Sequence, residues 1–225
     1  MKGSFSLRPC GQDPEPCSLG ERGFLVAVVA QTRLSEMAVV AGPTASCLSC
    51  SSSSALSRID AMQVRRLRAT EWSALRELRL KALEDAPDAF SIQLAEAAAE
   101  LDDSWRERAR RGAEGMDEVV IVAQDDSTLI GMAAGRLAED EAAEAWLFAM
   151  WVEPTQRGDG IGEGLLRGVV DWARERGAHR LHLTVTESND AALSLYLRFG
   201  FKPTGDRMPL REGSHVQCLS LRLDI

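Results

Sequence analysis

The residues best suited to chemistry form a glycine-rich turn at positions 156–162, with the sequence QRGDGIG. Three glycines within five residues let the backbone approach a ligand closely. An amphipathic segment with helical periodicity follows, and the amides of a first helical turn lack partners inside the helix. Those amides and the positive end of the helix dipole attract anions, and Arg157 adds a charge suited to phosphate. The turn therefore predicts a pyrophosphate site.

The turn alone does not identify the nucleotide. A P-loop requires a GK[ST] sequence, which is missing here. A dinucleotide fingerprint has the spacing GxGxxG after the first strand of a βαβ unit, whereas Gly158, Gly160 and Gly162 lie two residues apart, about two-thirds of the way along the chain. A tight connection between a strand and a helix explains the glycines without any ligand.

A second pattern, at residues 189–201, completes the first. Asn189 is followed by Ala192, Tyr196 and the pair Gly200-Phe201, which match N-x-x-A-x-x-x-Y-x-x-x-G-F. The earlier turn matches [QR]-x-x-G-x-[GA]. Together the two segments resemble the GCN5-related N-acetyltransferase (GNAT) superfamily. The resemblance covers about residues 62–225.

The resemblance implies a mixed α/β fold. A mostly antiparallel central sheet is splayed between its fourth and fifth strands, with helices on both faces. Acetyl-CoA, the expected cosubstrate, would enter the opening between strands 145–152 and 180–186. By resemblance, the residues that bind it are Met150, Trp151, Val152, Arg157, Gly158, Asp159, Gly160, Ile161, Gly162, Asn189 and Tyr196.

The expected reaction is direct transfer of an acetyl group to a primary amine in a ternary complex. Because a tetrahedral intermediate must expel a thiolate, a tyrosine with an ordinary pKa of about 10 can reprotonate sulfur, whose thiol pKa is about 8.5. Tyr196, the only tyrosine in the chain, is the predicted acid, with a packed core aromatic as the alternative. A backbone N–H near Trp151 is expected to polarise the thioester carbonyl.

The group that accepts the proton of the amine stays open. Some family members place a glutamate at the start of the strand before the phosphate turn, and Glu144 stands there. Its alternative interpretation is an exposed charge. Glu118 and an ordered water chain are the other candidates. We expect the segment 87–105 to cover the acceptor, with side chains that suit a cation: Phe90, Glu96, Glu100, Asp102 and Asp103.

Several functions remain open. The acceptor is a small-molecule amine, slightly favoured, or a protein N-terminus or lysine. A non-catalytic acyl-CoA-binding module would need the phosphate turn without Tyr196. A dehydrogenase would leave residues 189–201 unexplained. Family members are often dimers, so a homodimer is an expectation of the resemblance alone.

Periodicity predicts the elements that position these residues. Thr70 is the predicted N-cap of the first helix. Asp102 or Asp103 is the predicted cap inside the second helical region, before Trp105. The predicted strands are 63–68, 118–124, 128–137, 145–152, 180–186, 201–207 and 215–223. The predicted helices are about 70 to near 87, 94–111, 161–176 and 191–199.

Composition sets the class. The chain has 225 residues, 45% of them hydrophobic and 27% charged, with a net charge of −8 that argues against nucleic acid as a partner. No apolar run spans a membrane, and the cysteine distribution favours the cytoplasm. No metal site is expected, because Cys47 and Cys50 lack a second ligand pair. Residues 1–61 are expected to be a disordered extension or sequence upstream of a true start at Met62.

Overall fold

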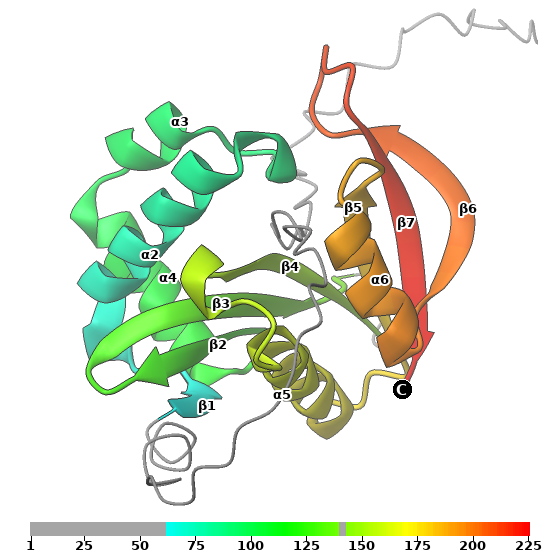
Figure 1. Ribbon diagram of the computed structural model, residues 1–225. Helices are drawn as coiled ribbons and strands as arrows, with labels where there is room; N and C mark the ends of the chain where they lie inside the picture. The colour runs from blue at the N-terminus through cyan, green and yellow to red at the C-terminus, as the bar shows by residue number, and fades with distance from the viewer. Residues whose placement is uncertain (1–61, 140–142) are drawn as a thin grey trace, which may run out of the picture.

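The computed structural model describes residues 62–139 and 143–225 (Figure 1). The predictions for residues 1–61, including the cysteine pair, lie outside the described part of the chain. The strands are β1 (Met62–Arg66), β2 (Glu118–Asp125), β3 (Thr128–Leu137), β4 (Glu144–Val152), β5 (Arg180–Thr186), β6 (Lys202–Pro209) and β7 (Gln217–Asp224). The helices are α2 (Trp72–Asp85), α3 (Leu94–Ala99), α4 (Asp102–Glu114), α5 (Ile161–Glu175) and α6 (Asp190–Phe199).

One mixed sheet organises the fold. Its strand order is β1-β2-β3-β4-β5-β7-β6, and all neighbours are antiparallel except β4 and β5. The predicted fold class, a mostly antiparallel sheet with helices on both faces, is confirmed.

The predicted splay of the sheet lies between β4 and β5. These parallel strands pair only where Glu144–Trp146 meets Arg180–His182, and they diverge beyond that point (Figure 1). Val152 therefore lies six residues past the last pair, on a length of β4 without a β5 neighbour. The divergence opens a gap in the sheet at the end of β4 that leads into the glycine-rich turn.

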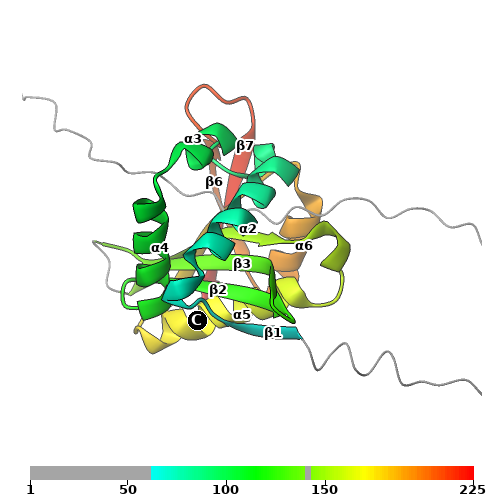
Figure 2. The ribbon, with the colours of Figure 1, turned by 90° about the vertical axis from the view of Figure 1, so that its left-hand side faces the viewer.

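Helices cover the two faces of the sheet unequally. Helices α2 and α4 lie over β2 and β3 on one face, and α5 runs along the opposite face (Figure 2). Gly135 in β3 allows α5 to approach, because a Cβ there would lie 2.8 Å from atoms of Trp172 and Val169. Helix α6 lies beside β5 and β7 (Figure 1). None of the described helices is long and apolar enough to span a bilayer.

Two predicted helix caps are wrong. A short 3₁₀ turn precedes α2, and the Glu71 carboxylate, rather than the Thr70 side chain, accepts the Arg68 N–H at 2.9 Å. The second helical region is two helices, and α4 begins after Leu101 without a side-chain cap. The carboxylates in its first turn instead favour the positive end of the helix dipole.

Candidate active site

The glycine-rich turn joins β4 to α5. Gly158 (φ +99°) and Gly160 (φ +80°) adopt left-handed backbone conformations that residues with a Cβ avoid. A Cβ at either position would have no atom within 4 Å, so the turn borders open space. The amides of Ile161 and Gly162 begin α5 and have no partner within the helix. Backbone amides at an exposed helix start are therefore available to the predicted anion.

Arg157 does not extend its charge toward that site. Its guanidinium donates hydrogen bonds to Asp85 at the end of α2 (2.5 Å) and to the Val152 carbonyl (2.8 Å). The side chain is only 7% exposed. Its backbone N–H donates to the Pro154 carbonyl at 3.4 Å. Arg157 therefore fixes the turn to α2 instead of presenting a free cation to phosphate.

A β-bulge interrupts β4. Ala149 has φ +52°, and the register with β3 shifts between Met132 and Ala134. An extra residue in a strand alters the alternation of its side chains. Phe148 and Ala149 both line a cavity on the α2–α4 side, while Met150 turns toward α6. In a regular strand Glu144 and Met150 would share one face, because they are six residues apart, but the bulge interrupts that alternation.

The pairing of β3 with β4 determines which amides face the gap. The Glu153 N–H donates to the Ile130 carbonyl of β3 at 2.8 Å. Because alternate residues of a strand direct their N–H groups to opposite sides, the Val152 N–H faces the gap, and the Trp151 N–H faces β3. The amide that faces the gap near Trp151 is therefore the Val152 N–H, and the Trp151 N–H itself is directed toward β3.

Tyr196 lies on the face of α6 turned toward the unpaired part of β4. Its side chain is fully buried, and its hydroxyl donates a hydrogen bond to the Met150 sulfur at 3.6 Å. The ring meets Phe201 edge-on, with centroids 5.7 Å apart. Burial raises the pKa of the phenol well above its ordinary value. Tyr196 consequently carries its proton throughout the neutral range.

Asn189 is the N-cap of α6. Its side-chain oxygen accepts the Ala192 N–H at 3.0 Å. Such a bond satisfies one of the four unpaired amides at a helix start. The asparagine of the sequence motif thus holds the start of the helix that carries Tyr196, and its side-chain oxygen is already engaged.

The structure does not bring Glu144 to Tyr196. Glu144 lies where β4 and β5 pair, with its oxygens 2.6 Å from Arg180 and 3.1 Å from His182 Nε2. Six residues of strand separate it from Met150, about 20 Å at 3.3 Å per residue. The second predicted base, Glu118, is 7% exposed and lies 3.2 Å from the Arg136 guanidinium.

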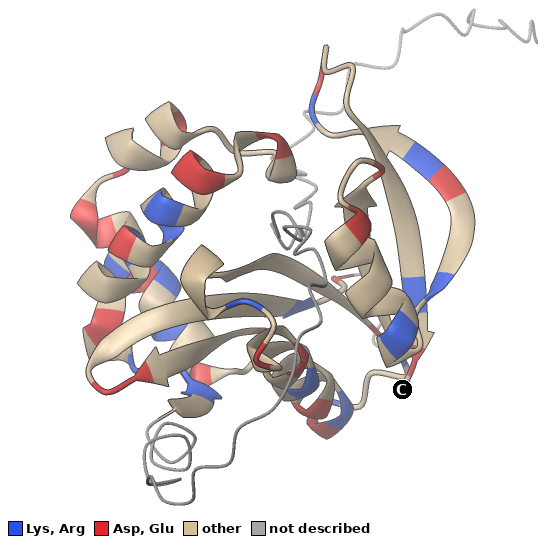
Figure 3. Ribbon diagram, in the orientation of Figure 1, with Lys and Arg blue, Asp and Glu red and all other residues tan. Residues whose placement is uncertain are grey.

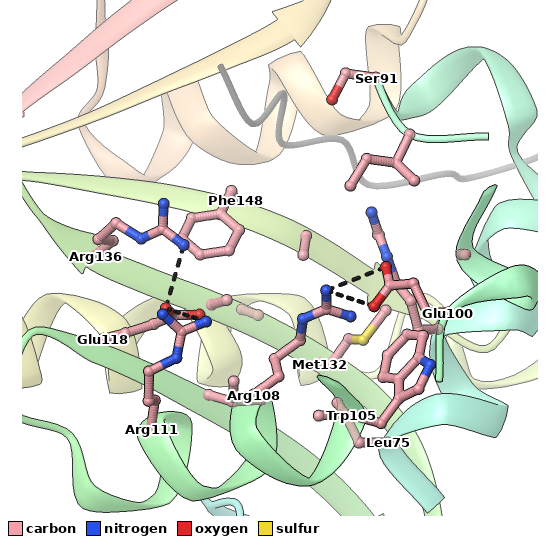
Figure 4. Close-up of a pocket in the computed structure, with 17 residues that line it drawn as sticks. Leu75, Ser91, Glu100, Trp105, Arg108, Arg111, Glu118, Met132, Arg136 and Phe148 are labelled. Carbon is pink, nitrogen blue, oxygen red and sulfur yellow. Dashed lines mark hydrogen bonds and ion pairs between the residues drawn. The ribbon is translucent and has the colours of Figure 1, made fainter. Parts of the chain in front are cut away.

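A cavity of about 460 Å³ lies between α2, α3, α4 and the sheet (Figure 4). Phe148 and Ala149 bring it to β4, next to Met150. Of the five side chains expected to suit a cation, only Glu100 lines this cavity, and its oxygens accept hydrogen bonds from Arg108. The charged residues around the cavity are Arg79, Arg108, Arg111, Arg136, Glu100 and Glu118.

Most of the acidic residues predicted to face the acceptor lie away from this cavity. Glu96, Asp102 and Asp103 are exposed and lie outside the cavity lining. Their exposure follows from helix geometry, because they lie in the first turns of α3 and α4, where carboxylates remain in water and favour the dipole. The blue segments on the ribbon of Figure 3 mark basic positions on α2 and α4, alongside acidic positions in red.

Comparison with known proteins decides the family. The family model described as "Acetyltransferase (GNAT) family" matches residues 72–201, more than half of the chain. The chain belongs to the GNAT acetyltransferase family. The matched residues run from the start of α2 to the Gly200-Phe201 pair.

Curated GNAT relatives match parts of the chain. Streptothricin acetyltransferase of Streptomyces lavendulae is 37% identical over 49% of this chain and 62% of its own length. N-alpha-acetyltransferase RimI of Mycobacterium tuberculosis is 33% identical over 58% of this chain and 84% of its own length. The chain thus spans less than two-thirds of the first of these relatives.

Solved GNAT structures share the fold. A GNAT-family acetyltransferase from Streptococcus pneumoniae has a TM-score of 0.62 at 20% identity and covers 73% of this chain and 99% of its own. An acetyltransferase structure from Salmonella typhimurium, described with its cofactor acetyl-CoA, has a TM-score of 0.59 at 21% identity. It covers 72% of this chain and 93% of its own.

Two residues of this GNAT site escaped the sequence analysis. Asp85 gave no signal, because its bonds to Arg157 and Trp151 join distant segments. Arg79 could have been recognised from the sequence, because it lies on the buried face of α2 with Leu75, Leu78 and other apolar residues. A charge on an otherwise apolar helical stripe indicates a buried polar site.

The described residues include one cysteine, Cys218. Cys218 is buried, as expected of a small core residue, and burial raises its thiol pKa to about 11. The thiol is therefore protonated and a weak nucleophile at neutral pH. Within residues 62–139 and 143–225, no three His, Cys, Asp or Glu side chains gather in a group that could hold a metal.

Proposed function

We propose that this enzyme transfers the acetyl group of acetyl-CoA directly to a primary amine, and that the amine belongs to a small molecule. One observation carries the proposal: the buried Tyr196 hydroxyl lies against Met150, on the unpaired part of β4 that leads into the glycine-rich turn. That arrangement puts a protonated acid beside the gap and an anion site at its end. Acetyl-CoA, when bound, supplies the thioester.

Backbone groups hold the cofactor in this proposal. The amides of residues 158–162 receive the pyrophosphate at the start of α5. The Val152 N–H, on the gap side of β4, is available to the pantetheine arm or the thioester carbonyl. The Asn189 oxygen caps α6, which leaves the amide nitrogen of that side chain as its donor to the arm.

Tyr196 acts as the general acid. With acetyl-CoA bound, the amine would bond to the acetyl carbon as the carbon–sulfur bond breaks, and the Tyr196 hydroxyl would donate its proton to the departing sulfur. Burial makes the phenol a weaker acid than an exposed tyrosine, yet it ensures that the proton is present at neutral pH. A positioned acid contributes roughly 10²–10⁴ in rate.

Water accepts the proton of the amine in this proposal. Glu144 is engaged by Arg180 and His182 at the closed end of the β4–β5 pair, and Glu118 is engaged by Arg136. The Glu144→Gln variant tests this view. When kcat is plotted against pH, we expect the fall in kcat at acid pH to remain in this variant. Loss of that fall would identify Glu144 as the general base.

The test measures acetyl transfer from acetyl-CoA to a panel of small amines and short peptides. We expect Tyr196→Phe to lower kcat about a hundredfold while the Kd for acetyl-CoA stays unchanged. Ser194→Ala, at an exposed position on the same helix, is the matched control. Unchanged kcat in Tyr196→Phe would remove the acid, and acetyl-CoA binding without any transfer would favour a non-catalytic acyl-CoA-binding module.

A protein N-terminus is the second candidate acceptor. The similarity to RimI of Mycobacterium tuberculosis favours it. The cavity of about 460 Å³ favours a small molecule, because its volume falls in the range of small-ligand pockets. Faster acetylation of peptides than of every small amine in the panel would decide for the protein acceptor.

A further inference from the structure

Arg79 is a buried charge without an evident counterpart. It lies on the face of α2 that packs on the sheet, with 8% of its surface exposed, and it lines the cavity. Its Nη1 atom is buried and has no hydrogen-bond partner among the described residues. The guanidinium stacks 4.3 Å above the ring of Phe90. Burying an unpaired ion costs several kcal/mol, so its retention indicates a missing anion.

The neighbouring charges do not supply that anion. Glu100 favours the charged form of Arg79, but both of its oxygens accept hydrogen bonds from Arg108. Burial, followed by repulsion from Arg108, lowers the pKa of Arg79 to about 10. Because that value remains well above 7, the side chain is a cation under ordinary conditions.

The whole cavity carries an excess of positive charge. Four arginines and two glutamates line it. Each glutamate already forms an ion pair, Glu100 with Arg108 and Glu118 with Arg136. Figure 4 shows the two clusters: Arg108 with Glu100 on one side, and Arg111 and Arg136 around Glu118 on the other. This excess stands in a chain whose net charge is −8. The basic character is thus local to the cavity.

We propose that the acceptor is a small amine that also carries a carboxylate, and that Arg79 binds this carboxylate. The inference rests on the proposed acetyl transfer and names the substrate class of the same site. A guanidinium presents a planar fork of donors that matches a carboxylate. One desolvated cation suits a monoanion, since Arg111 and Arg136 are about half exposed and share Glu118.

The cavity wall suits the rest of such a molecule. The wall is lined by the apolar side chains of Leu75, Val120 and Met132 and by Trp105. The Trp105 ring packs against the Arg108 guanidinium. Phe148 and Ala149 lead from the cavity to the unpaired part of β4. An apolar amino acid thus has an anion partner at Arg79, an apolar wall, and a path for its amine toward the acetyl-transfer site.

The experiment compares matched acceptors on the full chain. Phenylalanine, its amide and phenethylamine share an apolar body and differ in the carboxylate. We expect the wild-type kcat/KM for phenylalanine to be at least about tenfold above that for either analogue without the carboxylate, because hydrogen bonds to charged groups contribute that much. We expect Arg79→Met to abolish this preference, and Arg79→Lys to restore part of it.

Arg106→Met is the matched control, since Arg106 lies on α4 with half of its side chain exposed and does not line the cavity. It should keep the wild-type preference. Equal use of acid and amide by wild type, or an unchanged preference in Arg79→Met, would overturn the inference.

A second measurement separates this inference from the proposed function. Calorimetry with N-acetylphenylalanine and its amide reports anion binding without turnover. If no amine is acetylated, yet wild type binds the acid at least tenfold better than the amide and Arg79→Met does not, the carboxylate site stands and the proposed reaction fails. If acetyl transfer proceeds but the acid binds no better, the inference alone fails.

Discussion

The Asp85 carboxylate lies 2.5 Å from the guanidinium of Arg157, a residue 72 positions further along the chain. The same carboxylate oxygen accepts the Trp151 indole N–H at 2.9 Å. One side chain at the end of α2 therefore fixes both the end of β4 and the first residues of the glycine-rich turn. Helix α2 and the glycine-rich turn are joined at this point.

Removing that link should weaken both stability and cofactor binding. In Asp85→Ala, the Trp151 and Arg157 donors lose their acceptor, and we expect the free energy of unfolding to fall by about 2 kcal/mol. Asp85→Asn retains an acceptor and should lose less. Urea denaturation measures stability, and calorimetry measures the accompanying loss of acetyl-CoA affinity. Wild-type stability in Asp85→Ala would show that the link contributes nothing.

A pair of glycines separates backbone strain from ligand binding. Gly160 and Gly177 both have φ +80°, and a Cβ at either would have no atom within 4 Å. Alanine at each should cost about 1 kcal/mol in unfolding free energy through the left-handed backbone alone. Only Gly160→Ala should weaken acetyl-CoA binding, because Gly177 lies past the far end of α5. Equal affinities in the two variants would contradict an anion site at the turn.

The ionisation of Tyr196 can be followed directly, because it is the only tyrosine in the chain. Burial raises its pKa above the ordinary value of 10.0, so the tyrosinate absorbance should not rise near pH 10 while the protein is folded. The unfolded chain ionises there first, and stability should therefore fall as the pH rises past 10. A folded-state midpoint near 10 would mean that the hydroxyl reaches water.

His182 should make stability depend on pH at the acid side. Burial lowers its pKa below 6.5, although Glu144 opposes the shift and Arg222 and Arg180 assist it. As the pH falls below 6.5, the unfolded chain takes up a proton before the folded protein does, so stability present above 6.5 is lost. His182→Gln should reduce this loss in denaturation at successive pH values. The exposed His215→Gln should retain it; an identical profile in both variants would refute the assignment.

Arg79→Met should stabilise the protein while it impairs recognition. Methionine keeps an apolar stem in the cavity and removes an unpaired buried charge, so we expect the free energy of unfolding to rise by about 1 kcal/mol. Thermal and urea unfolding of the full chain measure this. A loss of several kcal/mol would instead mean that Arg79 has a structural counterion.

Local sequence determines much of this fold. The apolar stripe of Ile161, Leu165 and Val169 predicted α5 to within one residue, and the bounds of β5 were predicted correctly, because periodicity and neighbouring glycines report on local geometry. The splay of the sheet and the family came from two motifs matched together, since neither motif alone identifies a ligand.

Long-range contacts account for what sequence analysis missed. The bulge at Ala149 places an alanine at φ +52°, a conformation for which the sequence offers no glycine or asparagine signal. The link from Arg157 to Asp85 arises only when α2 packs beside β4. The acidic residues near α3 and α4 suggested a cationic acceptor, but solvent exposure decides which charges reach the cavity, and its buried cation is Arg79.

Calorimetric titration of acetyl-CoA into the full chain, with NAD as the control nucleotide, tests the central claim most directly. The account predicts micromolar binding of acetyl-CoA and none of NAD, with the affinity unchanged in Tyr196→Phe and reduced in Gly160→Ala. Absence of acetyl-CoA binding, or equal binding of NAD, would contradict the proposed cofactor and with it the reaction.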